Sequence, residues 1–165
     1  MNELIEQIIV RKSPKSEVPI KAGIVLLCVI FFLLFFITAS SFMLIVMALV
    51  VVGAVFVFRS FNLEYEYSWF NNELQIDKII SKSSRRKGPT FDFSRMEVMA
   101  PLGSSELLRM ENGNYRKMNY TSNDPEALVY SAYVFCNGEL VNLLFEPNSE
   151  MVNSIRTLNS RKVFD

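Results

Sequence analysis

The chain has 165 residues, half of them hydrophobic, and its 17 lysines and arginines balance its 17 aspartates and glutamates. With no net charge there is no overall positive field for a nucleic acid, so we expect no nucleic-acid partner. The sequence has no histidine, the commonest general acid–base group and the commonest metal ligand, so we expect a non-enzymatic protein without a cofactor.

The first segment, residues 1–21, carries a helical pattern of apolar residues. Leu4, Ile5, Ile8 and Ile9 recur at the spacing of one helix face. We therefore predict a short amphipathic helix in a cytoplasmic N-terminal segment. It would lie on the membrane or pack on the folded domain, and the sequence leaves both placements open.

An apolar block follows, in which the 37 residues 22–58 include no charged side chain. As one helix it would extend about 55 Å, whereas the hydrocarbon core of a bilayer is about 30 Å thick. We predict a transmembrane helical hairpin with spans at residues 22–38 and 42–58. The turn falls at Thr38-Ala39-Ser40-Ser41, whose hydroxyl groups can satisfy backbone groups where the helices break.

The charges beside this block predict its orientation. Arg11, Lys12, Lys15 and Lys21 precede the block and Arg59 follows it, whereas the turn carries no positive charge. The positive-inside rule then places both termini in the cytoplasm, in a multi-pass protein of the cell membrane.

A cleaved signal peptide is the alternative interpretation of the same block. Its apolar region would be residues 24–37, and its small-residue cleavage site would be Thr38-Ala39-Ser40. Such a leader would be long and would contain acidic residues, and a second apolar segment would follow the cleavage site directly. These features favour the hairpin.

Residues 59–165 are predicted to form one cytoplasmic domain that begins with a β-hairpin. Over residues 63–69 apolar and polar side chains alternate, as they do in a half-buried strand. Asn71-Asn72 is a turn signal, and Leu74 and Ile76 belong to the returning strand.

Further strands and one helix are expected in the rest of this domain. The strands fall at residues 91–93, 98–100, 128–136 and 139–145, the last two joined by a turn at Asn137-Gly138. A helix capped by Asn148 or Ser149 follows, with an apolar stripe formed by Met151, Val152, Ile155 and Leu158. The predicted class is therefore α+β, with six or seven antiparallel strands and a C-terminal helix.

This order of elements resembles the pleckstrin-homology-like (PH-like) fold, a curved sheet or partly open barrel that its last helix closes. The chain is also similar to bacterial two-span membrane proteins that carry a PH-like cytoplasmic domain. The stretches that carry this resemblance are residues 61–67, 72–79 with the basic loop behind them, and 6–12 at the N-terminus. The resemblance covers most of the chain, and because its motifs are structural it implies a fold and no catalytic residue.

A basic cluster of Lys82, Arg85, Arg86 and Lys87 follows the second strand of the domain, and Lys78 lies just before it. The first strand starts after Arg59, at the end of the second span, and the second strand returns, so we expect this loop at the membrane-proximal end of the domain. Each cation near an anionic leaflet contributes about 1 kcal/mol of binding free energy. A solvated loop, non-specific contact with anionic lipid, and a specific headgroup or protein site all stay open.

Other polar and aromatic groups have simpler interpretations. Glu64 and Glu66 share a polar strand face near Glu73 and Asp77, as on an ordinary solvent-facing surface. Cys136 is expected to be a small buried side chain. Aromatic residues at strand spacing are expected in the barrel interior, namely Tyr65, Tyr67, Trp69, Phe70, Tyr130, Tyr133 and Phe135.

These features predict a membrane-anchored interaction or scaffold module at the cytoplasmic leaflet. Its partners would be the lipid bilayer and a protein in the membrane or the cytoplasm. The alternative is a membrane-associated enzyme or transporter accessory protein that uses carboxylate, tyrosine or lysine groups. A deep pocket with several convergent polar groups would favour this alternative.

Overall fold

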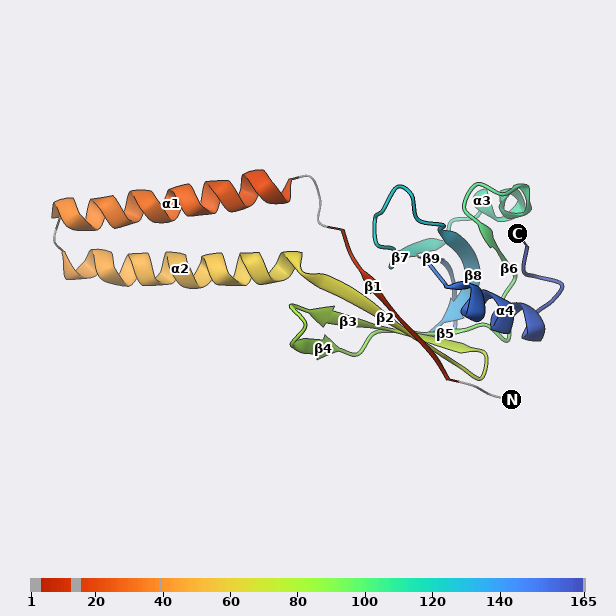
Figure 1. Cartoon of the computed structure of the whole chain (residues 1–165). Coiled ribbons are helices and arrows are strands. Elements are labelled where there is room, and N and C mark those ends of the chain that lie inside the picture. The colour runs from red at the N-terminus through yellow and green to blue at the C-terminus, as the bar shows by residue number, and fades with distance from the viewer. Residues whose placement is uncertain (1–3, 13–15, 39, 165) are drawn as a thin grey trace. The chain divides into compact units, whose positions relative to one another are not determined.

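The computed structural model describes residues 4–12, 16–38 and 40–164. They form two compact units (Figure 1): the helical unit Ser13–Leu63, and the sheet domain, which combines Met1–Lys12 with Glu64–Asp165. Lys15 and Ala39, which belong to the predicted charged flank and the predicted turn, lie outside the described residues.

The helical unit consists of α1 (Glu17–Thr38) and α2 (Ser41–Phe61), which lie side by side in Figure 1. By length and composition, Glu17–Thr38 and Ser41–Arg59 could each cross a membrane, and their apolar windows are not buried within the described chain. A soluble protein would cover such large apolar surfaces, so their exposure suggests that the chain associates with a membrane.

Both helices coincide with the two predicted apolar segments, although α1 begins five residues earlier than expected. It starts at Glu17, whose carboxylate forms an ion pair with Lys21 one turn later. The Lys21 ammonium also lies over the rings of Phe58 and Phe61 in α2, 5.8 and 5.6 Å from their centroids. These contacts extend the helical structure beyond the uncharged block.

The described part of the sheet domain contains nine strands, three of which were not expected from the sequence. Their bounds are β1 (Ile5–Val10), β2 (Leu63–Phe70), β3 (Glu73–Ile80), β4 (Ser84–Arg86), β5 (Thr90–Asp92), β6 (Val98–Pro101), β7 (Arg116–Asn119), β8 (Tyr130–Cys136) and β9 (Glu139–Phe145). The spatial order is β1-β2-β3-β5-β8-β9-β7, while β4 pairs with β3 and β6 pairs with β8. Most pairings are antiparallel, as predicted, but β7 runs parallel to β9.

The predicted N-terminal amphipathic helix is wrong, because this segment is the edge strand β1. Its register with β2 runs from Ile5 opposite Trp69 to Val10 opposite Glu64. The polar residue Gln7 is tied to the loop before the last helix, where its Nε2 donates to the Glu146 carbonyl (2.9 Å) and its Oε1 accepts from the Asn148 amide (2.8 Å). The polar side chain of Gln7 interrupts the alternation of apolar and polar residues that would otherwise indicate a strand.

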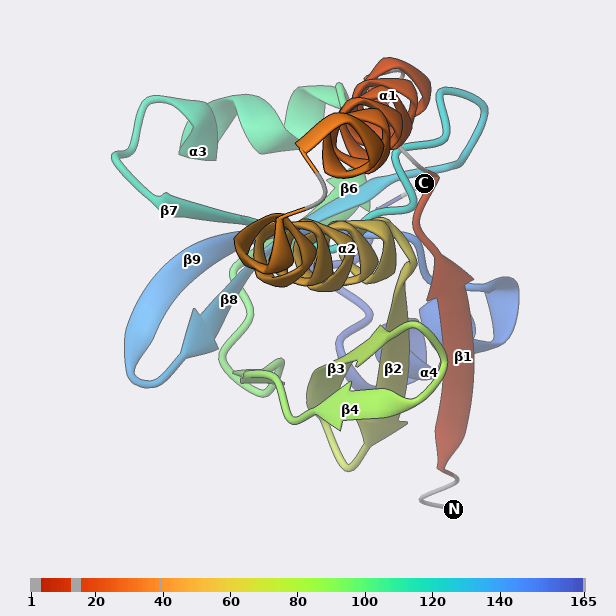
Figure 2. The ribbon, with the colours of Figure 1, turned by 90° about the vertical axis from the view of Figure 1, so that its left-hand side faces the viewer.

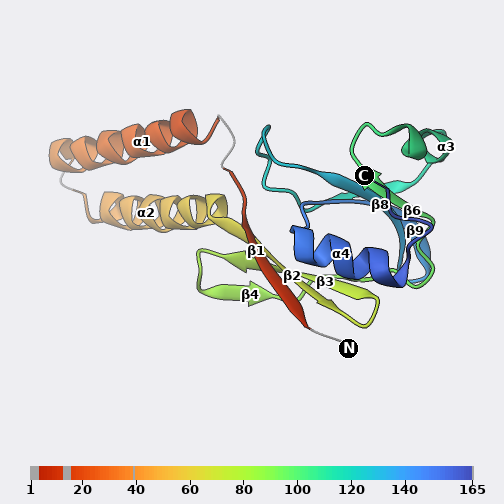
Figure 3. The same cartoon turned by 45° about the vertical axis from the view of Figure 1, so that its right-hand side comes forward.

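The last helix, α4 (Ser149–Leu158), confirms the prediction and closes the main core (Figure 3). The Asn148 side chain caps it by accepting from the Met151 amide at 2.8 Å. On β2 the indole Nε1 of Trp69 donates to the Ser154 hydroxyl of this helix at 2.9 Å. The Phe93 ring lies between the rings of Trp69 and Phe145, at centroid distances of 5.2 and 6.1 Å.

A second, smaller layer covers the outer face of the sheet. It is formed by η1 (Ser105–Leu107) and α3 (Leu108–Glu111) and is visible beside β6 and β7 in Figure 2. Tyr133 of β8 was expected among the aromatic residues of the main core, but it lies on the other face of the sheet from Ala132 and Val134, because side chains alternate along a strand. It packs with Val98, Ala100 and Leu107 in a separate apolar cluster beneath this layer.

Candidate functional site

The predicted basic cluster lies on the hairpin of β3 and β4, residues 78–87, which we call the basic arm (Figure 2). The strands pair from Lys78 opposite Arg86 to Ile80 opposite Ser84. Lys82 lies in the turn between the two strands and has a φ of 56°, the left-handed backbone conformation. The sequence analysis predicted a loop for Lys82, Arg85, Arg86 and Lys87, but residues 84–86 of this loop form the short strand β4, which pairs with β3.

Arg85 differs from the other cations of the basic arm because it has two acidic partners. Its Nη2 forms an ion pair with Glu66 Oε2 on β2, and its Nε lies 3.1 Å from Asp77 Oδ2 on β3. The two carboxylates therefore share one guanidinium on one face of the sheet. Arg85 is a structural ion-pair partner, and its charge is locally balanced.

The remaining four cations have no carboxylate partner among the described residues. Lys78 lies over the Tyr120 ring, 5.6 Å from the centroid, and stands directly opposite Arg86. Like charges in such cross-strand positions repel each other. Lys82, Arg86 and Lys87 are exposed, so the basic arm keeps a concentrated positive charge facing solvent.

The base of the arm is fastened to the sheet by Asp77. Its Oδ1 accepts hydrogen bonds from the Gln75 side chain (2.8 Å) and from the backbone amide of Gly88 (3.0 Å). Burial of this carboxylate would by itself raise its pKa, but the bonds from Gly88, Gln75 and Arg85 outweigh burial and lower the pKa below the usual value. The ionised form of Asp77 is therefore the form that holds the arm in place.

This geometry predicts a stability contribution that depends on pH. Because the folded-state pKa of Asp77 is lowered, its contribution is present above the unfolded-state pKa and is lost as pH falls through the folded value. Asp77→Asn should lower the free energy of unfolding by about 2 kcal/mol at pH 7. In denaturant titrations the difference from the wild type should shrink below about pH 4. A constant difference down to pH 2.5 would contradict this role.

The structure confirms most of the predictions for the aromatic residues, Cys136 and the carboxylates, but not all of them. Tyr65, Tyr67, Trp69 and Tyr130 are buried as expected, whereas Phe70 is 49% exposed. Cys136 is buried, and burial raises the pKa of its thiol, which leaves little reactive thiolate. Of the four predicted surface carboxylates, Glu66 and Asp77 meet at Arg85, a pairing that only the strand register reveals.

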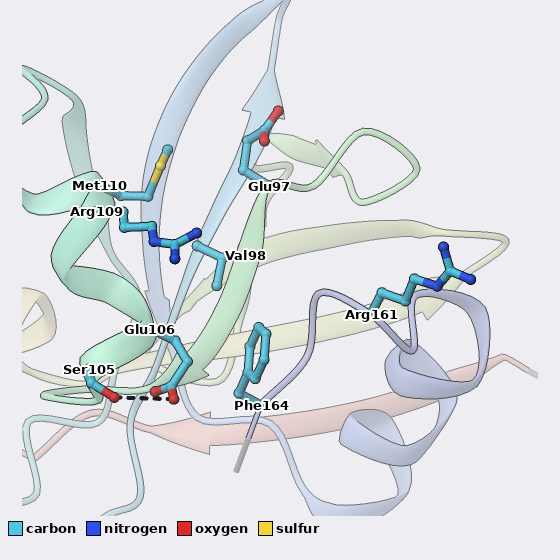
Figure 4. A pocket seen from close by; sticks show the side chains of 8 residues that line it. All are labelled: Glu97, Val98, Ser105, Glu106, Arg109, Met110, Arg161 and Phe164. Atoms are coloured by element: carbon cyan, nitrogen blue, oxygen red, sulfur yellow. Dashed lines mark hydrogen bonds between the residues drawn. The ribbon is translucent and has the colours of Figure 1, made fainter.

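A hollow of about 550 Å³ in the sheet domain lies beside α3 and the C-terminal segment (Figure 4). It is lined by both acidic and basic side chains, among them Glu97, Glu106, Arg109 and Arg161. In Figure 4, Arg109 points towards Val98, whereas Arg161 and Glu97 point away from it. The charges do not converge on one point, so this hollow does not form an anion site.

Comparison with known proteins gave one match. A family described as "Bacterial PH-like domain (DUF6106)" matches residues 1–165. No curated protein and no solved structure matches the chain.

Proposed function

This chain belongs to the bacterial PH-like domain family, and we propose that it is a non-enzymatic, membrane-anchored interaction module of the cytoplasmic leaflet. In this proposal the two apolar helices span the cell membrane, and the basic arm binds anionic lipid headgroups. The observation that carries the proposal is the group of four cations on one hairpin that lacks carboxylate partners among the described residues.

The pairing of β1 with β2 supports the hairpin topology. β1 precedes α1 and β2 follows α2, yet the two strands share one sheet. Segments that hydrogen-bond in one sheet lie on the same side of a membrane, which is consistent with an even number of crossings. The flanking positive charges then favour the cytoplasm for both segments.

The charge of the basic arm supports lipid contact. A cation near an anionic leaflet contributes about 1 kcal/mol, and Lys78, Lys82, Arg86 and Lys87 do not first have to give up a salt bridge among the described residues. Arg85 is engaged by Glu66 and Asp77 and keeps the hairpin in shape. The arm is therefore a rigid carrier of charge, which binds with a smaller loss of conformational entropy than a flexible tail.

The edge strand β1 supports a role in protein binding. Ile8 and Val10 on its outward face are 57% and 62% exposed. Strand β1 stands at one end of the strand order, so its outer edge presents unpaired backbone groups to an added strand. An extended segment of a membrane-associated protein is the kind of partner that this edge fits.

The test uses the full chain in lipid nanodiscs, because removal of the N-terminal residues would also remove β1. Acylation rates of Lys78, Lys82 and Lys87 are compared by mass spectrometry in zwitterionic phosphatidylcholine and in discs that contain phosphatidylglycerol. We expect the anionic discs to slow these rates about fivefold, the equivalent of about 1 kcal/mol. Salt at 0.5 M should remove the effect, because it shortens the Debye screening length to about 4 Å.

A matched pair of variants distinguishes the arm from general charge effects. Lys82→Gln/Arg86→Gln/Lys87→Gln should abolish the protection of Lys78, whereas Arg116→Gln/Lys117→Gln on β7 should leave it unchanged. Equal acylation rates in both kinds of disc would remove the lipid-binding role.

A further inference from the structure

The smaller outer layer leaves a second cavity, separate from the basic arm. It lies between the residues around η1 and α3 and the strands β7, β8 and β9, and its volume is about 310 Å³. Leu102 and Leu107 line it from the outer layer, and Leu144 lines it from β9. Tyr115 also lines the cavity, with its ring packed edge-on against Tyr133 at 5.1 Å. One part of this cavity is therefore apolar.

The wall formed by β8 and β9 also carries a buried polar network. The Ser131 hydroxyl donates to Asn142 Oδ1 at 2.9 Å, and Asn142 Nδ2 donates to the Tyr133 hydroxyl at 3.1 Å. These residues line the cavity, with exposed fractions of 1%, 6% and 3% for Ser131, Asn142 and Tyr133. The bond from Ser131 fixes the Asn142 amide with its oxygen towards Ser131 and its nitrogen on the other side.

The side-chain amide of Asn142 has one hydrogen-bond donor that the network does not use. An amide nitrogen carries two protons, and the second proton on Asn142 Nδ2 has no acceptor among the described residues. Buried polar groups in folded proteins are normally satisfied. The unused donor therefore indicates a site where a water molecule or a ligand oxygen binds.

A basic residue on the neighbouring strand also lines this cavity. Lys117 on β7 lies directly opposite Asn142 in the parallel register and also lines the cavity. Adjacent strands are about 4.8 Å apart, so the ammonium and amide groups can both reach one carboxylate. Within the described part of the chain, Lys117 forms no salt bridge.

We propose that this cavity binds a small amphipathic carboxylic acid. Its carboxylate accepts hydrogen bonds from Asn142 Nδ2 and Lys117 Nζ, and its apolar body packs under Leu102, Leu107 and Leu144. The volume is at the lower end of the range for ligand sites, about 300–1,000 Å³. It corresponds to about ten water molecules of 30 Å³ each, so the ligand has a short chain or a single ring.

The network favours binding over catalysis. The Ser131 proton is directed to an amide oxygen, which does not act as a general base, so this hydroxyl is not activated as a nucleophile. Asn142 and Lys117 are both donors in this arrangement and bind an anion without a further reaction. The site would make the module responsive to a small metabolite.

The test uses the full chain in phosphatidylcholine nanodiscs and hexanoate as the probe, with empty discs as the blank. Calorimetric titration should show saturable binding of one hexanoate per chain. Lys117→Gln should weaken this binding about tenfold, since it removes a charge-assisted hydrogen bond. Arg116→Gln, a change to the neighbouring exposed cation outside the cavity, should leave the affinity unchanged.

Three further measurements assign the site. Saturating hexanoate should slow acylation of Lys117 but not of Lys82, and neutral hexanamide should bind the wild type and Lys117→Gln equally. Asn142→Asp should abolish hexanoate binding, with an unchanged Trp69 emission spectrum as evidence that the domain is folded. Absence of saturable binding, equal effects of Lys117→Gln and Arg116→Gln, or an unprotected Lys117 would each overturn the proposal.

Discussion

Phe93→Ala is expected to lower the free energy of unfolding of the sheet domain by about 4 kcal/mol. Phe93 is fully buried, and its ring lies edge-on to those of Trp69 and Phe145. Alanine would remove these contacts and leave a cavity that rigid neighbouring strands cannot fill. The loss is large because the aromatic core joins β2, β9 and the segment after β5.

Trp69 provides the measurement, because it is the chain's one tryptophan and is 1% exposed. Its fluorescence in a denaturant titration reports unfolding of the sheet domain, and a cavity beside its ring should also shift its emission. Phe70→Ala is the matched control, since Phe70 is 49% exposed and its loss should cost less than about 1 kcal/mol. Equal losses for the two variants would contradict the assignment of this core.

Gly88→Ala should cost the same domain about 3 kcal/mol. A Cβ at this position would lie 1.7 Å from the carbonyl oxygen of Ile76 and 2.9 Å from its carbonyl carbon. The backbone must then move away from β3, which also breaks the hydrogen bond from the Gly88 amide to Asp77. The variant should therefore loosen the base of the basic arm as well as destabilise the fold.

Two readouts separate these effects of Gly88→Ala. Trp69 fluorescence gives the loss of stability, and hydrogen exchange should show faster exchange of the β4 amides under native conditions. Gly53→Ala in α2 is the control, because a Cβ there meets no atom within 4 Å. Native-like exchange of β4 in Gly88→Ala would show that the close approach to Ile76 does not hold the arm.

Local sequence patterns predicted the elements whose partners lie close in the chain. The apolar helices, the hairpin of β2 and β3, the hairpin of β8 and β9, and α4 follow from periodicity and turn residues alone. The expected PH-like class follows from their order, and the family match over residues 1–165 confirms it. In these elements local preference and the final packing agree, as is usual in natural sequences.

The elements that were missed depend on distant partners. β1 pairs with β2, and both helices lie between these two strands in the sequence. The inward side chain of Gln7 forms hydrogen bonds with the backbone of Glu146 and Asn148, near the other end of the chain. β7 has only four residues and pairs in parallel with β9. In neither strand do apolar and polar residues alternate regularly enough to indicate a strand from the sequence alone.

The candidate sites were predicted only in part for the same reason. The composition of residues 78–87 revealed the basic arm, but not that Arg85 is balanced by Glu66 and Asp77. Lys117, Ser131 and Asn142 are ordinary surface-type residues in the sequence, and the register of β7, β8 and β9 brings them together. No pattern within any one segment could have identified that cavity.

The pairing of β1 with β2 also sets the order in which this protein can be assembled. During synthesis β1 leaves the ribosome first, and its partner β2 follows only after both helices have been made. The helical hairpin then brings the two strands together with a smaller entropic cost than a flexible loop of the same length. A chain in which α2 fails to form would therefore pair β1 with β2 only at a larger entropic cost, because a flexible segment then separates the two strands.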